Sequence, residues 1–412
     1  KEALSRIGKG VLVLPSSPEV LRNGDTNYPF RQESSFYYLT GFTEPGSVCV
    51  LTGAHEKERF VLFVRPRDPE AEMWNGRRAG IEGARERFGA DAAYPIEKLA
   101  EMLPEYLKGA QVVYYAFGQA HFDPKMLSAL QGARRFIRDG INPPSTFTDP
   151  MTLLGEMRLR KGPAEIARMR KAAEITAAGH AAAVAVSSPG KHEYELEAAL
   201  EHEFRRRGAQ GPAYPSIVGS GDNATILHYT ENHREMEAGD LVLIDAAAEY
   251  GYYACDVTRT FPVDGKMRPA QKALYDVVLK AQVECIRMTR PGVRFEEVHT
   301  RSVELLTEGM IGIGLLKGKR DEMIESKAFR RYFMHKTGHW LGLDVHDIGA
   351  YRVDGASRPL EPGMVFTIEP GLYVGASDET APKEFRGLGI RIEDDILVTP
   401  DGCDVLTKAI PK

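Results

Sequence analysis

The sequence predicts an α/β chain of two domains, the second with α+β character. At 412 residues the chain is longer than one typical domain, and 43% of its residues are hydrophobic, which is ample for two cores. Early in the chain, the apolar runs 10–16 and 59–66 have the length of strands, whereas residues 100–109 have helical spacing. Short strands that alternate with helices are typical of a compact α/β domain.

The domain boundary is predicted from a segment of turn-forming residues. Residues 138–150 are rich in proline and polar turn formers, and we interpret them as a linker between domains 1–150 and 151–412. Pro163 then opens an apolar pattern at helical spacing that runs to residue 186, which predicts a long amphipathic helix. Helices are also expected near 194–207 and 295–309, each ahead of strands and loops, so a faint helix, helix, strand order occurs twice.

Two aspartates lie in a predicted β-hairpin at residues 241–261. If Tyr250 and Gly251 form its two-residue turn, Asp245 lies directly opposite Asp256, with Cβ atoms roughly 5 Å apart. Like charges that face each other in an apolar hairpin are destabilising unless a cation lies between them. The pair therefore favours a metal site, and the alternative is that both aspartates are solvated or paired with Arg259.

The segment HKTGHWLGLDVHD places three of the eleven histidines of the chain between residues 335 and 347. His335 and His339 have the spacing of a helical zinc motif. However, Lys336 stands where that motif needs glutamate, and Gly338 and Gly342 disfavour a helix, so we reject that interpretation. A single histidine among apolar residues is usually a core residue, but three together favour a functional site.

Two further carboxylates follow strand-like runs. Glu369 ends an apolar strand closed by Pro370, and the alternation of GLGIRIEDD places Arg391 and Glu393 on one face of a strand. An acidic residue inside an apolar strand is costly to bury without a partner. Glu393 is therefore a candidate metal ligand, with an ion pair to Arg391 as the alternative.

These residues, in this order, resemble the pita-bread metallopeptidases, and among them the aminopeptidase P, or Xaa-Pro aminopeptidase, family. The match rests on Asp245, Asp256, the histidine of GHWLGLDVHD and the glutamates of TIEPGLY and GIRIEDD. Residues 24–46 resemble the N-terminal domain of the family, and ILHYTEN places His228 where the family has a substrate-site histidine. The resemblance covers nearly the whole chain.

The resemblance implies a creatinase-like N-terminal α/β domain and a pita-bread catalytic domain of two related halves with two divalent metal ions between them. In the family pattern Asp256 and Glu393 bridge the metals, Asp245 completes one coordination sphere, and His339 with Glu369 completes the other. Because the donors are mainly oxygens, manganese is the expected metal. The implied substrate is a peptide with proline in second position, and the implied reaction is hydrolysis of the Xaa-Pro bond by a metal-bridging hydroxide.

Catalytic and substrate-binding roles also follow from the resemblance. Glu369 is expected to transfer the proton, His346 and His228 to hold the scissile carbonyl, and Arg391 to support the carboxylates. The substrate-site candidates are His228, Tyr229, His335, Trp340 and Tyr373. Core packing is the alternative for the three aromatic residues.

Other functions remain as alternatives. Prolidase shares the ligands and the proline preference but takes dipeptides. A noncatalytic pita-bread binding module is the alternative from another class, although such proteins typically lose ligands and none is missing here. Methionine aminopeptidase needs no long N-terminal domain of this kind, and creatinase uses the fold without this metal set.

Composition and charge limit the partners. The net charge of −5, with both signs mixed, disfavours nucleic acid or an anionic membrane as the main partner. No apolar run is long enough to span a bilayer, and no signal-peptide pattern or disulfide framework is evident, so we expect a cytoplasmic protein. Bacterial relatives imply a homodimer or homotetramer whose N-terminal domains border the active site, with Asp25 and Trp74 as candidates. Arg352 and Arg358 lie in a loop that departs from the family pattern.

Overall fold

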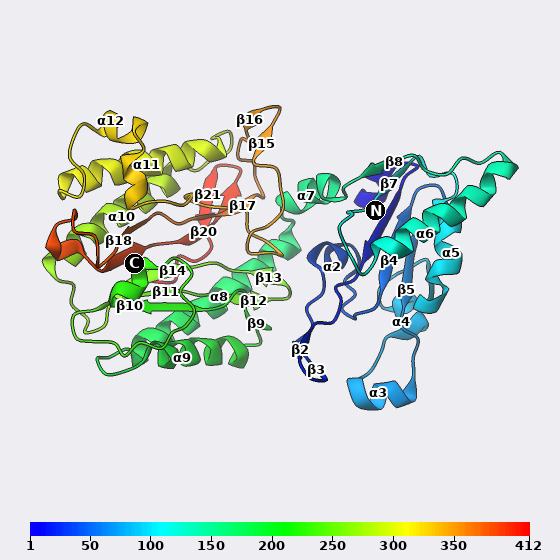
Figure 1. Cartoon of the computed structure of the whole chain (residues 1–412), viewed down its shortest axis with the longest axis horizontal. Coiled ribbons are helices and arrows are strands. Elements are labelled where there is room, and N and C mark those ends of the chain that lie inside the picture. Colours follow the sequence, from blue (N-terminus) through cyan, green and yellow to red (C-terminus); the bar gives the residue numbers. More distant parts are fainter. The chain divides into compact units, whose positions relative to one another are not determined.

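The computed structural model describes all residues, 1–412, and the chain divides into two compact units, Lys1–Met157 and Arg158–Lys412 (Figure 1). Both units combine helices and strands, which confirms the predicted α/β class. None of the helices combines the length and the apolarity that crossing a bilayer requires.

The first unit is built on a six-stranded mixed sheet with the order β6-β5-β4-β1-β7-β8. The predicted strands at 10–16 and 59–66 are β1 and β5, and the predicted helix at 100–109 is α5. Helices α5 and α6 cover the sheet through a core that includes Val13, Phe63, Leu103 and Met126. The helices are α1 (Glu2–Ile7), α2 (Ser34–Thr40), α3 (Pro69–Asn75), α4 (Gly80–Glu86), α5 (Leu99–Leu107) and α6 (Asp123–Ala133), with 3₁₀ turns η1 (Ile96–Lys98) and η2 (Arg134–Asp139). The strands are β1 (Val11–Pro15), β2 (Leu21–Asn23), β3 (Thr26–Asn27), β4 (Val48–Thr52), β5 (Phe60–Val64), β6 (Ala92–Pro95), β7 (Val112–Tyr114) and β8 (Thr146–Thr148).

The segment predicted as a linker is partly structured. Residues Thr146–Thr148 form β8, which pairs in parallel with β7 at the edge of the sheet. The β-branched and aromatic side chains of this short run suit a strand, although prolines precede it. The chain then enters α7 (Met151–Leu159). The boundary between the two compact units falls within this helix, after Met157.

The second unit contains two long helix pairs and several small sheets. The long helix predicted from Pro163 is α8, with Pro163 in its first turn, as the fixed φ of proline favours. The helices are α8 (Pro163–Val186), α9 (Glu193–Arg206), α10 (Pro269–Met288), α11 (Phe295–Gly312) and α12 (Arg320–Glu325), with 3₁₀ turns η3 (Gly221–Thr225), η4 (Ala328–Arg331) and η5 (Lys383–Phe385). The strands are β9 (Gly211–Pro212), β10 (Ile217–Ser220), β11 (Leu241–Asp245), β12 (Ala248–Tyr250), β13 (Tyr253–Ala254), β14 (Thr258–Pro262), β15 (Arg352–Val353), β16 (Ala356–Ser357), β17 (Val365–Ile368), β18 (Gly371–Val374), β19 (Leu388–Arg391), β20 (Asp394–Thr399) and β21 (Gly402–Val405).

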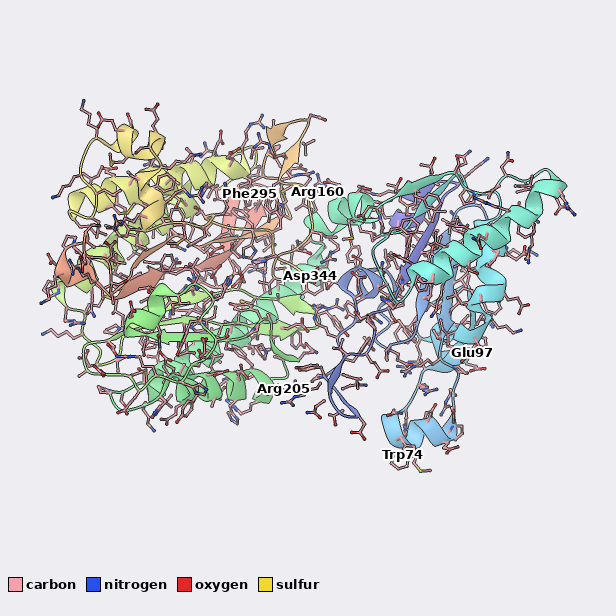
Figure 2. The ribbon with its side chains drawn as sticks, in the orientation of Figure 1. Trp74, Glu97, Arg160, Arg205, Phe295 and Asp344 are labelled. Carbon is pink, nitrogen blue, oxygen red and sulfur yellow. The ribbon has the colours of Figure 1, made fainter.

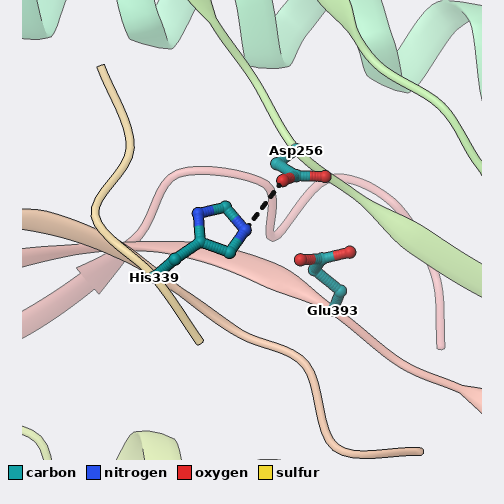
Figure 3. Close-up of side chains that lie close together, drawn as sticks. All are labelled: Asp256, His339 and Glu393. Carbon is teal, nitrogen blue, oxygen red and sulfur yellow. Dashed lines mark ion pairs between the residues drawn. The ribbon is translucent and has the colours of Figure 1, made fainter. Parts of the chain in front are cut away.

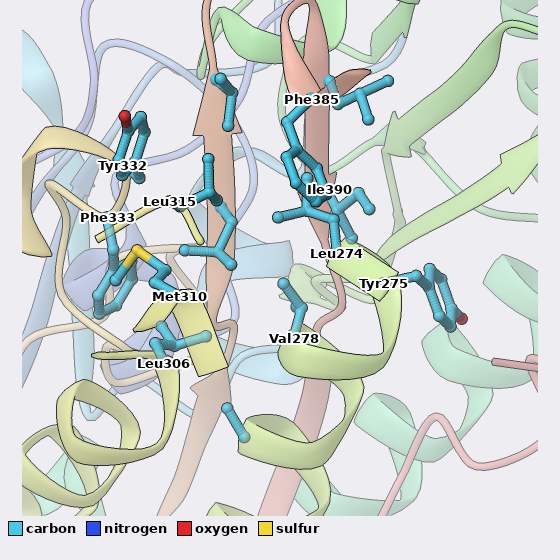
Figure 4. Close-up of a cluster of buried hydrophobic side chains, with 14 of the residues drawn as sticks. Leu274, Tyr275, Val278, Leu306, Met310, Leu315, Tyr332, Phe333, Phe385 and Ile390 are labelled. Atoms are coloured by element: carbon cyan, nitrogen blue, oxygen red, sulfur yellow. The ribbon is translucent and has the colours of Figure 1, made fainter. Parts of the chain in front are cut away.

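These elements form two halves, as the family resemblance implies; the repeated order in the sequence is too faint to establish this from the residues alone. In the first half, a core that includes Leu196, Phe204 and Ile244 joins α8 and α9 to the sheet β10-β11-β14. In the second half, α10 and α11 cover β18 and β19 through Val278, Ile390 and their neighbours (Figure 4). Figure 1 shows the strands of both halves between the two helix pairs, and β11 and β14 of the first half contact β19 of the second.

The hairpin at 241–261 exists, but its predicted register is wrong by two residues. Gly251 and Tyr252, not Tyr250 and Gly251, form the turn, and both have positive φ, as a two-residue turn of type I′ requires. Asp245 therefore lies opposite Thr258 rather than Asp256. A shift of two residues keeps every side chain on its original face, so both carboxylates still share one face as diagonal neighbours.

Candidate active site

A cavity of about 940 Å³ in the second unit contains all five predicted metal ligands. It also contains His228, His335, His346 and Arg391, which the sequence analysis assigned to catalysis or substrate binding. The remaining lining residues are Tyr214, Pro215, Ile217, Leu227, Thr230, Phe295, Glu296, His299, Lys336, Gly338, Val345, Tyr351, Arg352 and Ser357. Residues from both halves thus converge on one space.

Three of the predicted ligands are brought closest together. Ligand atoms of Asp256, His339 and Glu393 all lie within 4.8 Å of one another, and Figure 3 shows their side chains pointing to a common centre. Nε2 of His339 lies 3.3 Å from Oδ2 of Asp256 and 3.7 Å from Oε1 of Glu369. The carboxylates of Asp256 and Glu393 are almost completely buried.

Backbone pairing places His339 and Glu369 beside each other. Residues 337–341 run antiparallel to β17: Thr367 donates its N–H to the carbonyl of His339, and Glu369 donates to the carbonyl of Thr337. Glycine is required at Gly338, since a Cβ there would lie 1.9 Å from the carbonyl oxygen of Thr367. The segment 335–347 contains no helix, which agrees with the rejection of a helical zinc motif.

Asp245, at the end of β11, is held from two sides. Tyr214 donates its hydroxyl hydrogen to Oδ1 at 2.7 Å, and Nη2 of Arg391 lies 2.6 Å from Oδ2. Arg391 also donates to the hydroxyl of Tyr373, at 2.9 Å. The alternative ion pairs, of Arg259 with the two aspartates and of Arg391 with Glu393, do not form. Arg391 pairs with Asp245 instead, and Arg259 pairs with Asp394.

The buried carboxylates have raised pKa values. Burial raises the pKa of Glu369 to about 7, and burial and the neighbouring carboxylates raise the pKa of Glu393 well above its ordinary value. The pKa of Asp245 is likewise raised by burial, although Arg391 opposes the change. Burial disfavours a charged His339, yet the hydrogen bond and charge of Asp256 outweigh it and raise its pKa to about 9. The cluster therefore favours added positive charge.

The donor set fits divalent metal ions. Four carboxylates and one imidazole suit hard or borderline cations. Nδ1 of His339 lies 3.1 Å from the carbonyl oxygen of Trp340, an acceptor, so Nδ1 carries a hydrogen and the lone pair of the neutral ring is on Nε2, which faces the carboxylates. Behind the cluster, Thr258 donates its hydroxyl hydrogen to Oε2 of Glu393 at 2.7 Å.

The predicted substrate-site histidines lie around this cluster. The ring centroids of His339 and His346 are 4.3 Å apart and nearly perpendicular. Nε2 of His335 lies 2.9 Å from the hydroxyl of Tyr373, and burial lowers the pKa of His335 to about 4. Burial also lowers the pKa of His346. Neutral imidazoles in these positions are able both to donate and to accept a hydrogen bond.

His228 lies in a segment that one buried carboxylate organises. Glu193, at the start of α9, accepts hydrogen bonds from the backbone N–H of Ser220 and of Arg234 and from the hydroxyl of Tyr229. The side chains of Ser220 and Asn223 also donate to Glu193. The wall of the cavity that carries His228 is therefore fixed at both ends.

The aromatic candidates are placed differently from the histidines. Tyr229 is turned to Glu193, and Trp340 is fully buried in a core with Phe366, so neither lines the cavity. Tyr373 is buried and its hydroxyl contacts Arg391 and His335. Of the two loop arginines, Arg352 lines the cavity, whereas Arg358 donates to the carbonyl of Ala350.

Sequence reasoning missed several lining residues. Phe295 and Tyr351 bring aromatic rings to the cavity and pack against each other, with centroids 5.0 Å apart. His299 is also at the wall, with Nδ1 2.9 Å from the hydroxyl of Thr337, and burial lowers its pKa to about 4. Phe295 and His299 are one helical turn apart on α11, a spacing that an amphipathic core face also produces, so no local signal separates them from core residues.

Comparison with known proteins follows the same division of the chain. Residues 167–400 match Metallopeptidase family M24, and residues 1–114 match the N-terminal domain of aminopeptidase P. An Xaa-Pro aminopeptidase of Escherichia coli is 48% identical over 98% of this chain and 92% of its own length.

Solved structures agree with these matches. The Pseudomonas aeruginosa aminopeptidase PepP is similar with a TM-score of 0.97 and 45% identity, over 100% of this chain and 93% of that one. A variant of Escherichia coli aminopeptidase P in complex with substrate has a TM-score of 0.95 and 46% identity, over the same shares of the two chains. With a metal-binding cluster in the region that matches the peptidase, and with both family matches in order along the chain, this protein belongs to metallopeptidase family M24, in the form that carries an aminopeptidase P N-terminal domain.

Proposed function

We propose that this protein is an Xaa-Pro aminopeptidase, which removes the first residue from peptides with proline in second position and uses two divalent metal ions. The observation that carries the proposal is the convergence of four carboxylates and His339 in one cavity of about 940 Å³, which is large enough for a short peptide. The similarity to an Xaa-Pro aminopeptidase over 98% of this chain supports it.

We assign the five predicted ligands to two metal ions. Asp256 and Glu393 are central to the cluster, and we assign them to both metals. Asp245, on the side of Arg391, belongs to one metal, and His339 with Glu369 belongs to the other. When bound, such a pair supplies Lewis acidity and lowers the pKa of water towards neutrality.

The surrounding residues position the peptide and move its protons. Glu369 lies in the cavity beside His339 and is assigned to accept a proton and to return it to the leaving nitrogen. His346 and His228 face the cavity and are assigned to the scissile carbonyl and its developing negative charge. Arg391 holds Asp245 in place and thereby orients the carboxylate cluster.

Selection of proline requires apolar, ring-shaped surface, since the Xaa-Pro bond has no N–H to recognise. We propose that Phe295 and Tyr351 supply part of that surface, because both line the cavity. Tyr373 and His335 form a hydrogen-bonded pair beside it. Trp340 then acts through Tyr351, on which it stacks with centroids 5.3 Å apart, and Tyr229 acts by anchoring the His228 segment.

Manganese is the proposed working metal. A site with four carboxylates, one imidazole and no thiolate has little soft character, which favours Mn²⁺ over Zn²⁺ as the resident ion. Three of the four cysteines are buried and all are unpaired, which suits the reducing cytoplasm that we propose as the location.

Assembly into a homodimer or homotetramer is also proposed. On the first unit, Met73 and Trp74 are 83% and 81% exposed, and Figure 2 shows Trp74 on the outer side of α3. Val20 and Leu21 are exposed as well, and Asp25 lies in the nearby turn between β2 and β3. Exposed apolar groups of this size favour a protein interface, and we assign the first unit, from residue 1 to about 150, to that role.

The test is hydrolysis of an Xaa-Pro-Yaa tripeptide and of the matching Xaa-Pro dipeptide by protein reloaded with manganese. Cleavage of the tripeptide that disappears in Asp256→Ala, but not in the exposed control Asp264→Ala, is the expected result. Preferred cleavage of the dipeptide would instead make the protein a prolidase. Cleavage of neither peptide would favour the noncatalytic binding module.

A further inference from the structure

We propose that Asp347 is a positioning residue: its buried carboxylate fixes the loop that carries both His339 and His346. The inference rests on the proposed function, because His339 is assigned there to a metal and His346 to the scissile carbonyl. It concerns a residue that does not line the cavity and that none of the assigned roles requires.

The loop from His339 to His346 has little regular structure of its own. Asp347 donates its backbone N–H to the carbonyl of Trp340 at 2.9 Å, which closes the loop at its base, and Gly342 donates to the carbonyl of Asp344 at 3.1 Å. The two histidines stand at the two ends of this closed loop, with ring centroids 4.3 Å apart. The relative position of His339 and His346 therefore depends on the contacts that hold the base of the loop at Asp347.

The base is held by buried charges. The side chains of Asp347, Lys161 and Arg158 are each 1–2% exposed, with Nζ of Lys161 3.0 Å from Oδ2 of Asp347 and Nη2 of Arg158 bonded to Oδ1. Arg158 also reaches the more exposed Asp344, at 2.7 Å. Oδ1 of Asp347 accepts a further hydrogen bond from the N–H of Ile348. Two cations thus face two carboxylates, so charge is balanced.

The backbone at Gly342 packs closely against the carboxylate of Asp347. A Cβ on Gly342 would lie 2.1 Å from Oδ2 of Asp347 and 2.9 Å from Cε of Lys161. The backbone of Gly342 does not have positive φ, so the requirement for glycine comes from this close approach and not from backbone conformation. The loop is therefore folded directly onto the carboxylate of Asp347 and its lysine partner.

This arrangement connects the start of the second unit to the catalytic loop. Arg158 lies in the last turn of α7 and Lys161 lies two residues before α8, whereas His346 is the residue immediately before Asp347. Removing the negative charge of Asp347 leaves Arg158 with Asp344, takes the ion-pair partner from Lys161 and loosens the base of the loop. A small displacement of His346 is then enough to weaken its contact with the reacting carbonyl.

The experiment combines Asp347→Asn with His346→Ala in a double-mutant cycle on the manganese-loaded protein. Asp347→Asn is expected to lower kcat for the tripeptide about 10- to 100-fold with KM changed less than about threefold. In the His346→Ala background, the same substitution is expected to cause a clearly smaller loss, because the part of the effect that acts through His346 is already absent and only the part that acts through His339 remains. Asp344→Asn, which removes the exposed partner of Arg158, is the matched control and is expected to stay within about twofold of the wild type.

Two outcomes would overturn the proposal. One is an unchanged kcat in Asp347→Asn, and the other is an equal loss in both backgrounds, which a general effect on stability produces. Should Asp347→Asn fail to fold, Lys161→Gln is the substitute, because it leaves Arg158 as the buried partner of Asp347. We expect it to lower kcat less than Asp347→Asn does, with the same dependence on His346. A wild type that binds Mn²⁺ in calorimetry but cleaves no peptide refutes the proposed function alone. In that case about tenfold weaker metal binding by Asp347→Asn, but not by Asp344→Asn, still supports positioning of His339, and equal binding refutes it.

Discussion

The hydroxyl of Thr258 donates to Oε2 of Glu393 at 2.7 Å and accepts from Nε of Arg391 at 3.0 Å. Thr258 belongs to β14 in the first half of the second unit, whereas Glu393 and Arg391 belong to the second half. One hydroxyl therefore joins the halves at the point where they share the metal cluster. The N–H of Glu393, which donates to the carbonyl of Thr258, completes this connection.

Thr258→Val replaces this hydroxyl by a methyl group of similar size. Glu393 then loses a donor and Arg391 loses an acceptor, so we expect metal affinity or activity to fall about 10- to 100-fold. Calorimetry with Mn²⁺ measures the affinity directly. Thr260→Val is the matched control, because Thr260 is equally buried on the same strand but bonds only the backbone of Arg391. Equal metal affinity in the two variants would contradict the prediction.

Removal of the metal ions should destabilise the protein. Without cations, buried carboxylates repel one another, and a ligand present at 100 times its dissociation constant contributes about 2.7 kcal/mol to the folded state. We expect a chelator to abolish activity and to lower the Tm by several degrees, and Mn²⁺ to restore both. Differential scanning calorimetry is the measurement. In Asp256→Asn the Tm should no longer respond to the chelator, and a Tm that still falls would point to a metal site elsewhere.

His180 predicts a loss of stability at acidic pH. Its Nε2 lies 2.9 Å from the carbonyl oxygen of Ala246, and burial lowers its pKa from 6.5 to about 4. Between these values the unfolded chain binds the proton more readily than the folded one. The stabilisation is therefore present above pH 6.5 and is lost as the pH falls towards 4, by on the order of 3 kcal/mol.

Urea unfolding from pH 7 to pH 4 tests this effect. His180→Gln retains a donor for the carbonyl of Ala246 but does not titrate, so its free energy of unfolding should fall less steeply with decreasing pH. His202→Gln, at an exposed position of α9, should retain the wild-type slope. Parallel slopes for all three proteins would show that His180 does not contribute.

The close packing of Gly389 against the other half of the second unit predicts that a larger residue there is destabilising. A Cβ at this position of β19 would lie 1.9 Å from the carbonyl oxygen of Ala224 in η3, and backbone cannot give way as a flexible side chain does. We expect Gly389→Ala to destabilise the protein by about 1–3 kcal/mol or more. Gly375→Ala, where nothing lies within 4 Å of the added carbon, is the control and should unfold like the wild type in a thermal melt. Indistinguishable melts for the two variants would contradict the close approach.

The sequence predicted the parts of the site whose signals are local. Asp245 and Asp256 were singled out as candidate ligands because two like charges in one apolar hairpin are conspicuous, and the error of two residues in register leaves both side chains on the same face. Glu369 was singled out at the end of an apolar strand and Glu393 inside one, where a carboxylate is costly to bury without a partner. Their convergence depends on the pairing of distant strands, which local patterns do not specify, and the family resemblance supplied it.

Contacts between distant segments escaped prediction. Nothing near Asp347 indicates that its partners are Arg158 and Lys161, because 186 residues separate Lys161 from Asp347. The edge strand β8 was mistaken for a linker, because three residues next to turn formers carry too weak a pattern to show that β7 pairs with them. The residue types of Trp340 and Tyr229 likewise do not indicate that both side chains are buried.

The carboxylate of Glu193 has a consequence for the dynamics of the cavity wall. Because the amides of Ser220 and Arg234 donate to the same side chain, neither is freed for exchange with solvent deuterium unless that side chain lets go. The segment between them, with His228 inside it, should therefore exchange as one cooperative unit. We therefore expect the wall that carries His228 to keep its position when a peptide binds.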